Sequence, residues 1–388
     1  MPTEIQFTFI FLKIVMYVFL IIGGRNMAHA KTEKNYWISA MLPICAYTFT
    51  SGLRFGRDVD YNIYYFVYKG LLDGSENLSD FEPVFNFFVL LFGDFLGLKW
   101  QIMVLFMSFF LIFSCVYFLK NYKECSAYAL PWFVYHMSLA ENTARWFFAF
   151  SFILLGLSFY LKDKKSSKDV WLFWFFFLMA FLTHYGIIII EIIIGGFVCL
   201  KNRTIKPKYS LVLLALCAFF TSPLFLEKIG EYIALLGILT GRFEHYAIDA
   251  DKYFVGQEEY QAMQSSQYLY CVIMIYYGYK IIKVKQSLFL PYNIALVGII
   301  SNPFLAQLEI GLRINSVLFV FQSFVLGYVF VYMYRGKMFQ SLFLKIICIL
   351  IFVNLGRHVI FDPIKTKDSR LLYIWDKREK DYIDPDSY

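Results

Sequence analysis

Long apolar stretches separated by short, mostly basic segments run along almost the whole chain. Each stretch is about 15–22 residues long, near the length that a helix needs to cross a bilayer. They fall at 7–24, 36–52, 101–119, 126–141, 146–161, 170–184, 186–200, 209–226, 267–282, 288–304, 313–334 and 340–356. Because backbone groups in hydrocarbon must be paired within their own segment, these stretches are expected to be helices. The pattern predicts an all-α, polytopic membrane protein with about twelve transmembrane helices, forming one integral membrane domain over residues 1–388.

One further apolar stretch, residues 82–98, is interrupted by Gly93, Asp94 and Gly97 and decides the topology. Positive residues in short loops mark the cytoplasmic side of a membrane. Basic clusters occur at 25–34, 120–123, 162–168, 201–208, 280–285 and 335–337. If 82–98 crossed the membrane, the clusters before and after it would lie on opposite sides. We therefore predict a re-entrant or interfacial helix near 82–98, which places all six clusters inside.

This topology puts the largest polar segments on the outer face. They are the loops 53–100 and 227–266 and the tail 357–388, with both termini outside. The tail carries nearly balanced charge, so its charge does not indicate on which side of the membrane it lies.

Composition supports lipid as the main solvent of this chain. Hydrophobic residues make up 59% and charged residues only 17%, whereas soluble domains have about 25% charged residues. The seven cysteines show no metal-type spacing and are expected to be small buried hydrophobes. No HExxH, GxSxG, P-loop or GxGxxG motif occurs in its proper context, which argues against protease, esterase and nucleotide-driven functions. We expect no cofactor and no nucleic-acid partner.

Ionisable and aromatic residues gather in the predicted outer segments. The first outer loop holds several of them in eleven residues, and others lie at outer helix ends. The candidates are Arg54, Arg57, Asp58, Asp60, Tyr61, Tyr64, Glu82, Arg145, His184, Glu309 and Arg313. Each alone is explained by a solvated loop, a snorkelling anchor or a local ion pair. Ionisable residues in membrane segments nevertheless tend to mark sites, and their shared side favours one outward-facing polar cavity.

The residue types in this cavity suit an anionic ligand and proton transfer. Arginine offers fixed, forked donors that match phosphate and stays charged at physiological pH. Asp58, Asp60, Glu82 and His184 could accept a proton or orient hydroxyl groups. Since arginines can neutralise a phosphate, a metal is not required, although metal dependence stays open.

The ordered set of these residues resembles a known family. Arg54 to Tyr61 (RFGRDVDY), followed by Tyr64, resembles the arginine-plus-DYxxY signature of EpsG-like, Wzy-type polysaccharide polymerases. Glu82-Pro83-Val84-Phe85 is similar to the family's EP-x-F element. Arg145, His184 and Arg313 match an outer-turn arginine, a helix-ending histidine and a late arginine. The family commonly has Gln after that first arginine, where this chain has Trp146, and the resemblance covers roughly residues 36–335.

The resemblance implies a polymerase of O-antigen, capsule or exopolysaccharide, a glycosyltransferase that uses a polyprenyl-diphosphate donor. It would move a growing glycan from undecaprenyl diphosphate to the non-reducing end of a lipid-linked repeat unit. Expected partners are undecaprenyl-diphosphate-linked oligosaccharides and membrane lipid, with a chain-length regulator and a flippase. We assign Arg54, Arg145 and Arg313 to the diphosphate, with Arg57 as a fourth. His184 is preferred over Asp60 as base, and Glu82 would fix Arg54 or a sugar hydroxyl.

The other candidates are assigned to substrate binding: Asp58, Tyr61, Tyr64 and Glu309. Two alternative functions stay open. A lipid-linked oligosaccharide flippase should carry its charges near the midplane and show two related halves, neither of which is found. An O-antigen ligase differs only in its acceptor, so sequence separates it poorly.

Overall fold

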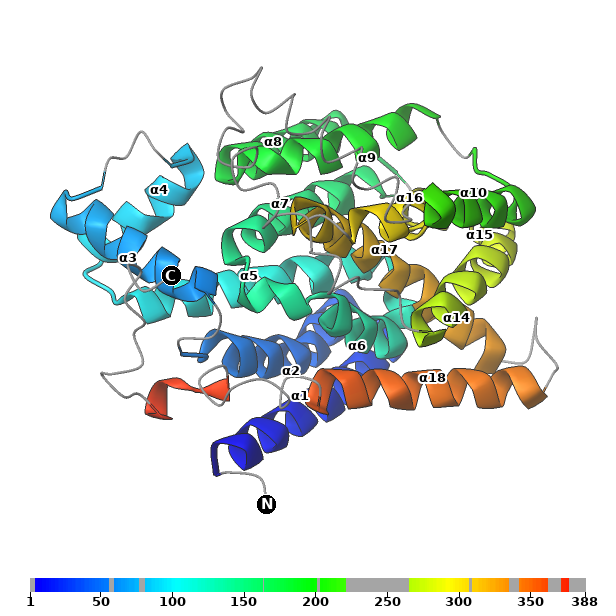
Figure 1. Ribbon diagram of the computed structural model, residues 1–388, viewed down its shortest axis with the longest axis horizontal. Helices are drawn as coiled ribbons and strands as arrows, with labels where there is room; N and C mark the ends of the chain where they lie inside the picture. Colours follow the sequence, from blue (N-terminus) through cyan, green and yellow to red (C-terminus); the bar gives the residue numbers. More distant parts are fainter. Residues whose placement is uncertain are drawn as a thin grey trace. The chain divides into compact units, whose positions relative to one another are not determined.

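The computed structural model describes residues 4–55, 59–76, 81–162, 164–200, 203–220, 265–306, 309–334, 342–361 and 371–376. Within these ranges the chain is helical and has no strand, apart from one isolated antiparallel bridge between Arg54 and Tyr373. Within the described residues, each predicted apolar stretch falls on one or more helices (Figure 1). The prediction of an all-α, apolar membrane protein is therefore confirmed for the described residues.

The chain divides into two compact units, which are described separately. Unit 1 comprises residues 1–192 and 326–388, and unit 2 comprises residues 193–325. Helices α9 (Ile188–Leu200) and α17 (Glu309–Tyr334) run through the boundaries. The expectation of one membrane domain stays a prediction.

Unit 1 is a stack of neighbouring helices (Figure 1). They are α1 (Glu4–His29), α2 (Glu33–Gly52), α3 (Val59–Asp73), α4 (Pro83–Val89), α5 (Trp100–Leu119), α6 (Ser126–His136), α7 (Ala144–Tyr160), α8 (Ser167–Thr183) and α18 (Leu342–Phe361). α8 packs on α7, α7 on α5, α5 on α2 and α2 on α1, while α6 and α18 also contact α1. Buried Phe, Leu, Ile and Val side chains fill these contacts. The order of the stack fixes which loops meet at each end.

Local sequence explains where several of these helices begin and end. Ser166 and Asp169 form a capping box at the start of α8, which pairs backbone N–H groups that the helix leaves unpaired. Pro83 occupies the first turn of α4, where its missing N–H costs nothing. Gly97 lies just after the π-helix that follows α4. Its φ of +60° is the left-handed conformation that glycine adopts easily.

The segment predicted near 82–98 consists of α4 followed by the π-helix η2 (Leu90–Phe95). The two together run over Pro83–Phe95, too short an apolar helix to cross a bilayer. The predicted interruption by Gly93 and Asp94 coincides with the π-helical turn. The depth of this helix in the membrane stays a prediction.

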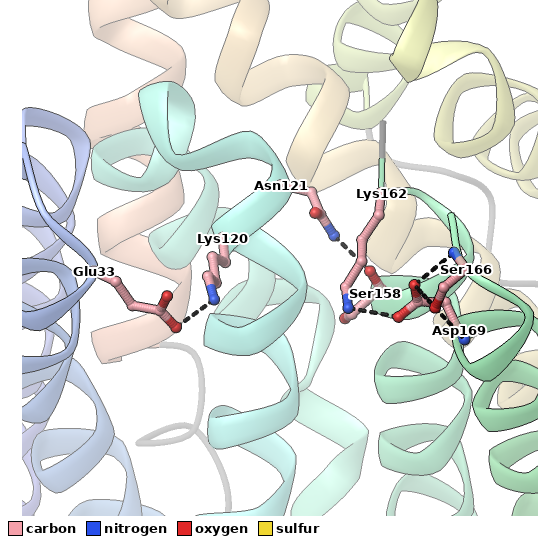
Figure 2. Close-up of polar contacts among 7 residues, drawn as sticks. All are labelled: Glu33, Lys120, Asn121, Ser158, Lys162, Ser166 and Asp169. Atoms are coloured by element: carbon pink, nitrogen blue, oxygen red, sulfur yellow. Dashed lines mark hydrogen bonds and ion pairs between the residues drawn. The ribbon is translucent and has the colours of Figure 1, made fainter. Parts of the chain in front are cut away.

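One end of unit 1 collects the basic clusters (Figure 2). Lys120 pairs with Glu33, and the Lys120 ammonium holds the pKa of that carboxyl below its usual value. Lys123 Nζ donates to the Ala30 carbonyl at 2.7 Å. Lys162 Nζ lies 2.6 Å from Asp169 Oδ1. The basic clusters at 25–34 and 120–123 thus lie side by side, as expected if 82–98 does not cross the membrane.

The other end of unit 1 lies a full helix length away. α2 has 20 residues, a length of about 30 Å, and its far end contacts the start of α5. There Gln101 Nε2 donates to the Gly52 carbonyl at 2.8 Å and to the Arg54 carbonyl at 2.9 Å. α7 begins and α8 ends at this same end.

Unit 2 contains α10 (Pro207–Phe220), α14 (Ser265–Ile273), η7 (Met274–Gly278), α15 (Tyr279–Val284), α16 (Phe289–Leu305) and the first part of α17. α10 packs against α16. The buried Asn302 and Asn315 side chains hydrogen bond to each other between α16 and α17.

Four helical segments among the described residues are long and apolar enough to cross a membrane: Glu4–His29, Trp100–His136, Gln286–Leu305 and Gly311–Tyr334. Trp100–His136 joins α5 and α6 through a kink at Tyr122. The larger number of spans expected from the sequence stays a prediction.

Candidate functional site

Arg145, Glu82 and His184 meet at the end of unit 1 opposite the basic clusters. Arg145 Nη1 lies 3.1 Å from Glu82 Oε2. His184 Nδ1 lies 3.8 Å from Glu82 Oε1, a distance that makes an ion pair when the imidazole is protonated. The three residues come from the first turn of α7, the N-cap of α4 and the C-cap of α8. One carboxylate therefore links a permanent cation to a titratable base.

Aromatic rings hold the Arg145 guanidinium from several sides. Its central carbon lies 4.9 Å from the ring centre of Tyr64, 5.1 Å from that of Phe85 and 5.6 Å from that of Phe81. Attraction between a cation and ring faces fixes the plane of the guanidinium. The Arg145 side chain keeps 19% of its surface exposed, so the group is oriented and still accessible to a ligand.

His184 is positioned by its neighbours on both sides. The Gly186 N–H donates to Nδ1 at 3.1 Å, and the Trp146 ring meets the imidazole edge-to-face with centres 5.2 Å apart. A Cβ at Gly186 would lie 3.0 Å from the Trp146 ring, so a larger residue here would force the ring to shift. In the neutral imidazole Nδ1 is thus an acceptor, and after protonation the same atom faces Glu82.

Arg54 lies at the same end of unit 1 but in a different setting. Its side chain is buried, and Nη1 donates to the Ser51 carbonyl at 2.5 Å and to Ser108 Oγ at 3.2 Å. Its backbone pairs with Tyr373: the Phe55 N–H donates to the Leu372 carbonyl at 3.0 Å. The Ile374 N–H in turn donates to the Leu53 carbonyl at 3.0 Å. A C-terminal segment therefore holds the loop that carries Arg54.

A small cavity lies between Arg54 and Glu141. Its polar lining comes from Tyr47, Arg54, Ser108 and Glu141, and its volume is about 10 Å³, room for about one water molecule. Ala144, the residue before Arg145, also lines it. Glu141 Oε1 accepts from Lys13 Nζ at 3.0 Å and from Ser51 Oγ at 3.1 Å. This polar cluster adjoins the turn that leads to Arg145.

The first turn of α3 is tied to both neighbouring segments. The Asp60 N–H, which lies in the first turn of the helix, donates to Asn142 Oδ1 at 3.1 Å. The Tyr61 hydroxyl donates to Gln101 Oε1 at 2.7 Å. Asp60 and Tyr61 therefore lie near the turn before Arg145 and the start of α5, at the same end as the other candidates.

The remaining candidates are not placed beside this cluster by the structure. Arg57 and Asp58 lie outside the described residues, and so does the side chain of Glu309, although its backbone begins α17. Arg313 belongs to unit 2, where its carbonyl accepts from Ser316 Oγ at 2.7 Å. Convergence of Arg313 with Arg54 and Arg145 stays a prediction.

One expected pairing differs in the structure. The carboxylate of Glu82 was expected to fix Arg54 or a sugar hydroxyl, and it pairs with Arg145. The reason is the packing of α4, which contacts α8 and brings Glu82 to the Arg145–His184 side. Among the described residues, no group of three or more His, Cys, Asp or Glu side chains could hold a metal ion.

Sequence reasoning did not single out Lys13, Ser51, Gln101, Glu141 and Asn142, which the structure places at or next to the candidates. A signal existed for three of them. Glu141 and Asn142 precede Arg145 in the same predicted outer turn, and Lys13 is a lone cation within an apolar stretch. Ser51 and Gln101 carry no such signal, because their roles depend on backbone contacts.

Comparison with known proteins gives one match. The chain is similar to the EpsG family, whose family model matches residues 37–373. The match includes Arg54, Glu82, Arg145, His184 and Tyr373 and leaves out all of α1, which contains Lys13. No curated protein and no solved structure matches the chain.

Proposed function

Because the chain belongs to the EpsG family, we propose that it polymerises a surface polysaccharide from repeat units carried on undecaprenyl diphosphate. The observation that carries the proposal is the Arg145–Glu82–His184 cluster, with a second arginine, Arg54, at the same end of unit 1. The expected products are O-antigen, capsule or exopolysaccharide chains. The reaction takes place at the outer face of a bacterial cytoplasmic membrane.

The proposed chemistry is displacement at an anomeric carbon. A hydroxyl at the non-reducing end of the acceptor unit forms a bond to the anomeric carbon of the growing chain. The bond from that carbon to the phosphate oxygen breaks, and undecaprenyl diphosphate leaves as an anion. A preorganised cation placed at the oxygen that gains charge stabilises this step without needing a proton donor.

Arg145 is the proposed cation for the leaving diphosphate. Its guanidinium is fixed by the Tyr64 and Phe85 rings and keeps donors beyond the one that contacts Glu82. Arg54 and Arg313, with Arg57, are proposed to complete diphosphate binding. Tyr61, Tyr64, Asp58 and Glu309 are proposed to contact substrate around them.

His184 is the proposed base. The acceptor hydroxyl proton passes to the imidazole as the hydroxyl oxygen bonds to the anomeric carbon, and the Glu82 carboxylate, 3.8 Å from Nδ1, stabilises the imidazolium. His184 is preferred over Asp60 because an imidazole titrates near neutral pH in its unperturbed state. Glu82 then orients Arg145 and supports His184 together.

The proposed topology has about twelve spans and a helix near 82–98 that stays on the outer side. The basic clusters face the cytoplasm and the arginine-rich end faces outward. Two lipid carriers would reach the site sideways from the bilayer, so that their head groups meet in a low-dielectric environment.

The test is polymerisation by the purified protein in lipid nanodiscs with synthetic undecaprenyl-diphosphate repeat units. The wild-type protein is expected to produce a ladder of chain lengths. His184→Ala and Glu82→Gln are expected to abolish the ladder, while Asp94→Asn, in the π-helical turn η2, keeps it. Near-native ladders from both His184→Ala and Asp60→Ala would overturn the assignment of the base.

The same assay separates the alternatives. A single transfer onto an acceptor, with no ladder, would identify a ligase. Movement of the labelled lipid across the bilayer without any new glycosidic bond would identify a flippase.

A further inference from the structure

Lys13 and Glu141 form a buried ion pair between the N-terminal helix and the turn before α7. Lys13 Nζ lies 3.0 Å from Glu141 Oε1, and the side chains keep only 9% and 17% of their surface exposed. Ser51 Oγ donates to the same carboxylate oxygen at 3.1 Å. Three segments, α1, α2 and η4 (Ser138–Glu141), therefore meet at one carboxylate.

A contribution to the stability of the fold does not by itself explain why a Lys13–Glu141 ion pair is buried here. Removing two charges from water costs several kcal/mol for each ion, and apolar replacements of a buried pair are often neutral or stabilising. Lys13 also lies within an apolar helix long enough to span a membrane. Charged residues in such segments are expensive and commonly have a role in a site.

The pair connects the two segments that carry Arg54 and Arg145. On one side, Ser51 lies three residues before Arg54 and accepts from Arg54 Nη1 through its carbonyl. On the other side, Glu141 precedes Asn142, which accepts from the Asp60 N–H. Arg145 follows in the first turn of α7. Arg54 and Glu141 also line one cavity, together with Ala144.

We propose that Lys13 and Glu141 are positioning residues that set the separation of Arg54 and Arg145. Lys13 fixes the Glu141 carboxylate, which accepts from Ser51 and holds the η4 turn against the end of α2. The ligand of the two arginines, the diphosphate of the lipid carrier, is the one assigned in the proposed function, and this part of the inference rests on that proposal. Lys13 lies before the residues that match the family model, whereas Glu141 lies within them.

A double-mutant cycle tests the proposal. The variants are Lys13→Met, Glu141→Gln and the two combined, each measured in nanodiscs for Tm, kcat and KM. Each single variant leaves one buried charge unpaired and is expected to lower Tm. The double variant removes both charges and is expected to recover most of the Tm. All three are expected to lose about tenfold or more in kcat, with a smaller change in KM.

The matched control is an ion pair at the opposite end of unit 1, Lys120 with Glu33. Its side chains are 38% and 65% exposed, and it lies at the basic end of unit 1. Lys120→Met and Glu33→Gln are expected to leave kcat unchanged. If the Lys13→Met/Glu141→Gln double variant regains wild-type kcat together with its Tm, the pair has only a structural role and the proposal is wrong.

Hydrogen exchange separates this proposal from the proposed function. Amides of residues 138–146, whose hydrogen bonds include Thr143 N–H to the Leu139 carbonyl at 2.9 Å, are expected to exchange faster in all three variants. Amides of residues 118–125 at the basic end should not change. Unchanged exchange at 138–146 contradicts the positioning role even if the protein is a polymerase. Faster exchange there in a protein that makes no polysaccharide keeps the positioning role and removes the proposed function.

Discussion

A substitution at Arg145 can show whether the site needs only a positive charge there or also the planar shape of the guanidinium. Its guanidinium contacts Glu82 and lies over the Tyr64 and Phe85 rings. Lysine would keep the charge but lose the planar fork and most of the ring stacking. Arg145→Lys is therefore expected to lower kcat/KM by about tenfold or more, about 1.4 kcal/mol of transition-state stabilisation. Arg25→Lys, at an exposed position of α1, is the control and should leave the rate unchanged. Full activity of Arg145→Lys would show that a point charge is enough.

Gly186 tests whether the placement of the His184 ring matters. A Cβ at this position would lie 3.0 Å from the Trp146 ring and 3.3 Å from His184 Nδ1. Gly186→Ala is expected to move the imidazole away from Glu82 and lower kcat several-fold with little change in Tm. Gly195→Ala in α9, where an added Cβ meets nothing within 4 Å, is the matched control. Equal kcat in the two variants would contradict a positioned histidine.

The start of α8 depends on a capping box that is sensitive to acid (Figure 2). The hydrogen bond from Lys162, with those from Ser166, holds the pKa of Asp169 below its ordinary value of 3.8. A carboxyl group with a lowered folded-state pKa stabilises the fold above its unfolded pKa and loses this contribution as pH falls below it. The Tm difference between wild type and Asp169→Asn should be constant from pH 7 to pH 5 and shrink below about pH 4. A difference that is the same at pH 3 and pH 7 would contradict the ionised cap.

Ser166 supplies the other half of this cap. Its hydroxyl accepts from the Asp169 N–H at 3.3 Å. Ser166→Ala is expected to destabilise the protein by about 1 kcal/mol. The effect should be visible as a lower Tm with unchanged kcat, since the cap lies at the end of α8 opposite His184. Lost activity at full stability would contradict the separation of the two ends.

The C-terminal segment Leu371–Asp376 acts as an element of the site because it pairs with the loop around Arg54. Tyr373 is fully buried against Phe9 and stacks on Trp375 with ring centres 4.8 Å apart. A chain that ends at residue 376 keeps this pairing, whereas one that ends at residue 370 lacks it. The shorter chain is expected to lose most polymerisation while still inserting in the membrane, and the longer one should stay active. Equal activity of the two chains would show that Arg54 needs no support from this segment.

The elements themselves could be predicted because their cause is local. In a lipid environment an apolar run of sufficient length has no alternative to the helix, and α2, α5 and α16 follow directly from this. The end at which Arg54, Arg145 and His184 lie could also be predicted, since each follows or precedes a helix of known direction. Which side chains pair with each other could not be predicted, because residues such as Lys13 and Glu141 are 128 positions apart in the sequence. Which side chains meet depends on how α1, α2 and η4 pack, and the pairing of residues 371–374 with Leu53–Phe55 likewise has no local signal.

At the scale of the whole molecule, the contacts in unit 1 constrain the topology. Lys120 pairs with Glu33, and Asn121 Nδ2 donates to the Ser158 carbonyl at 3.0 Å, so three basic clusters share one end. This arrangement requires the chain to cross the membrane an odd number of times between residue 52 and residue 120, and α5 is one such crossing. If 82–98 supplied a second, Glu33 and Lys120 would lie on opposite sides of the membrane. The predicted outward face of Arg54 and Arg145 therefore depends on 82–98 staying on its own side.

Cysteine labelling can establish this sidedness. With the native cysteines replaced by alanine, Ser75→Cys lies in the exposed turn after α3, and Lys164→Cys lies in the exposed basic loop before α8. A membrane-impermeant maleimide should label Ser75→Cys in right-side-out membranes and Lys164→Cys only in inverted ones, because positive loops stay in the cytoplasm. Labelling of both positions from the same side would mean that 82–98 crosses the bilayer. The Arg145–Glu82–His184 cluster would then lie at a depth or on a side that no outward-facing polymerase could use.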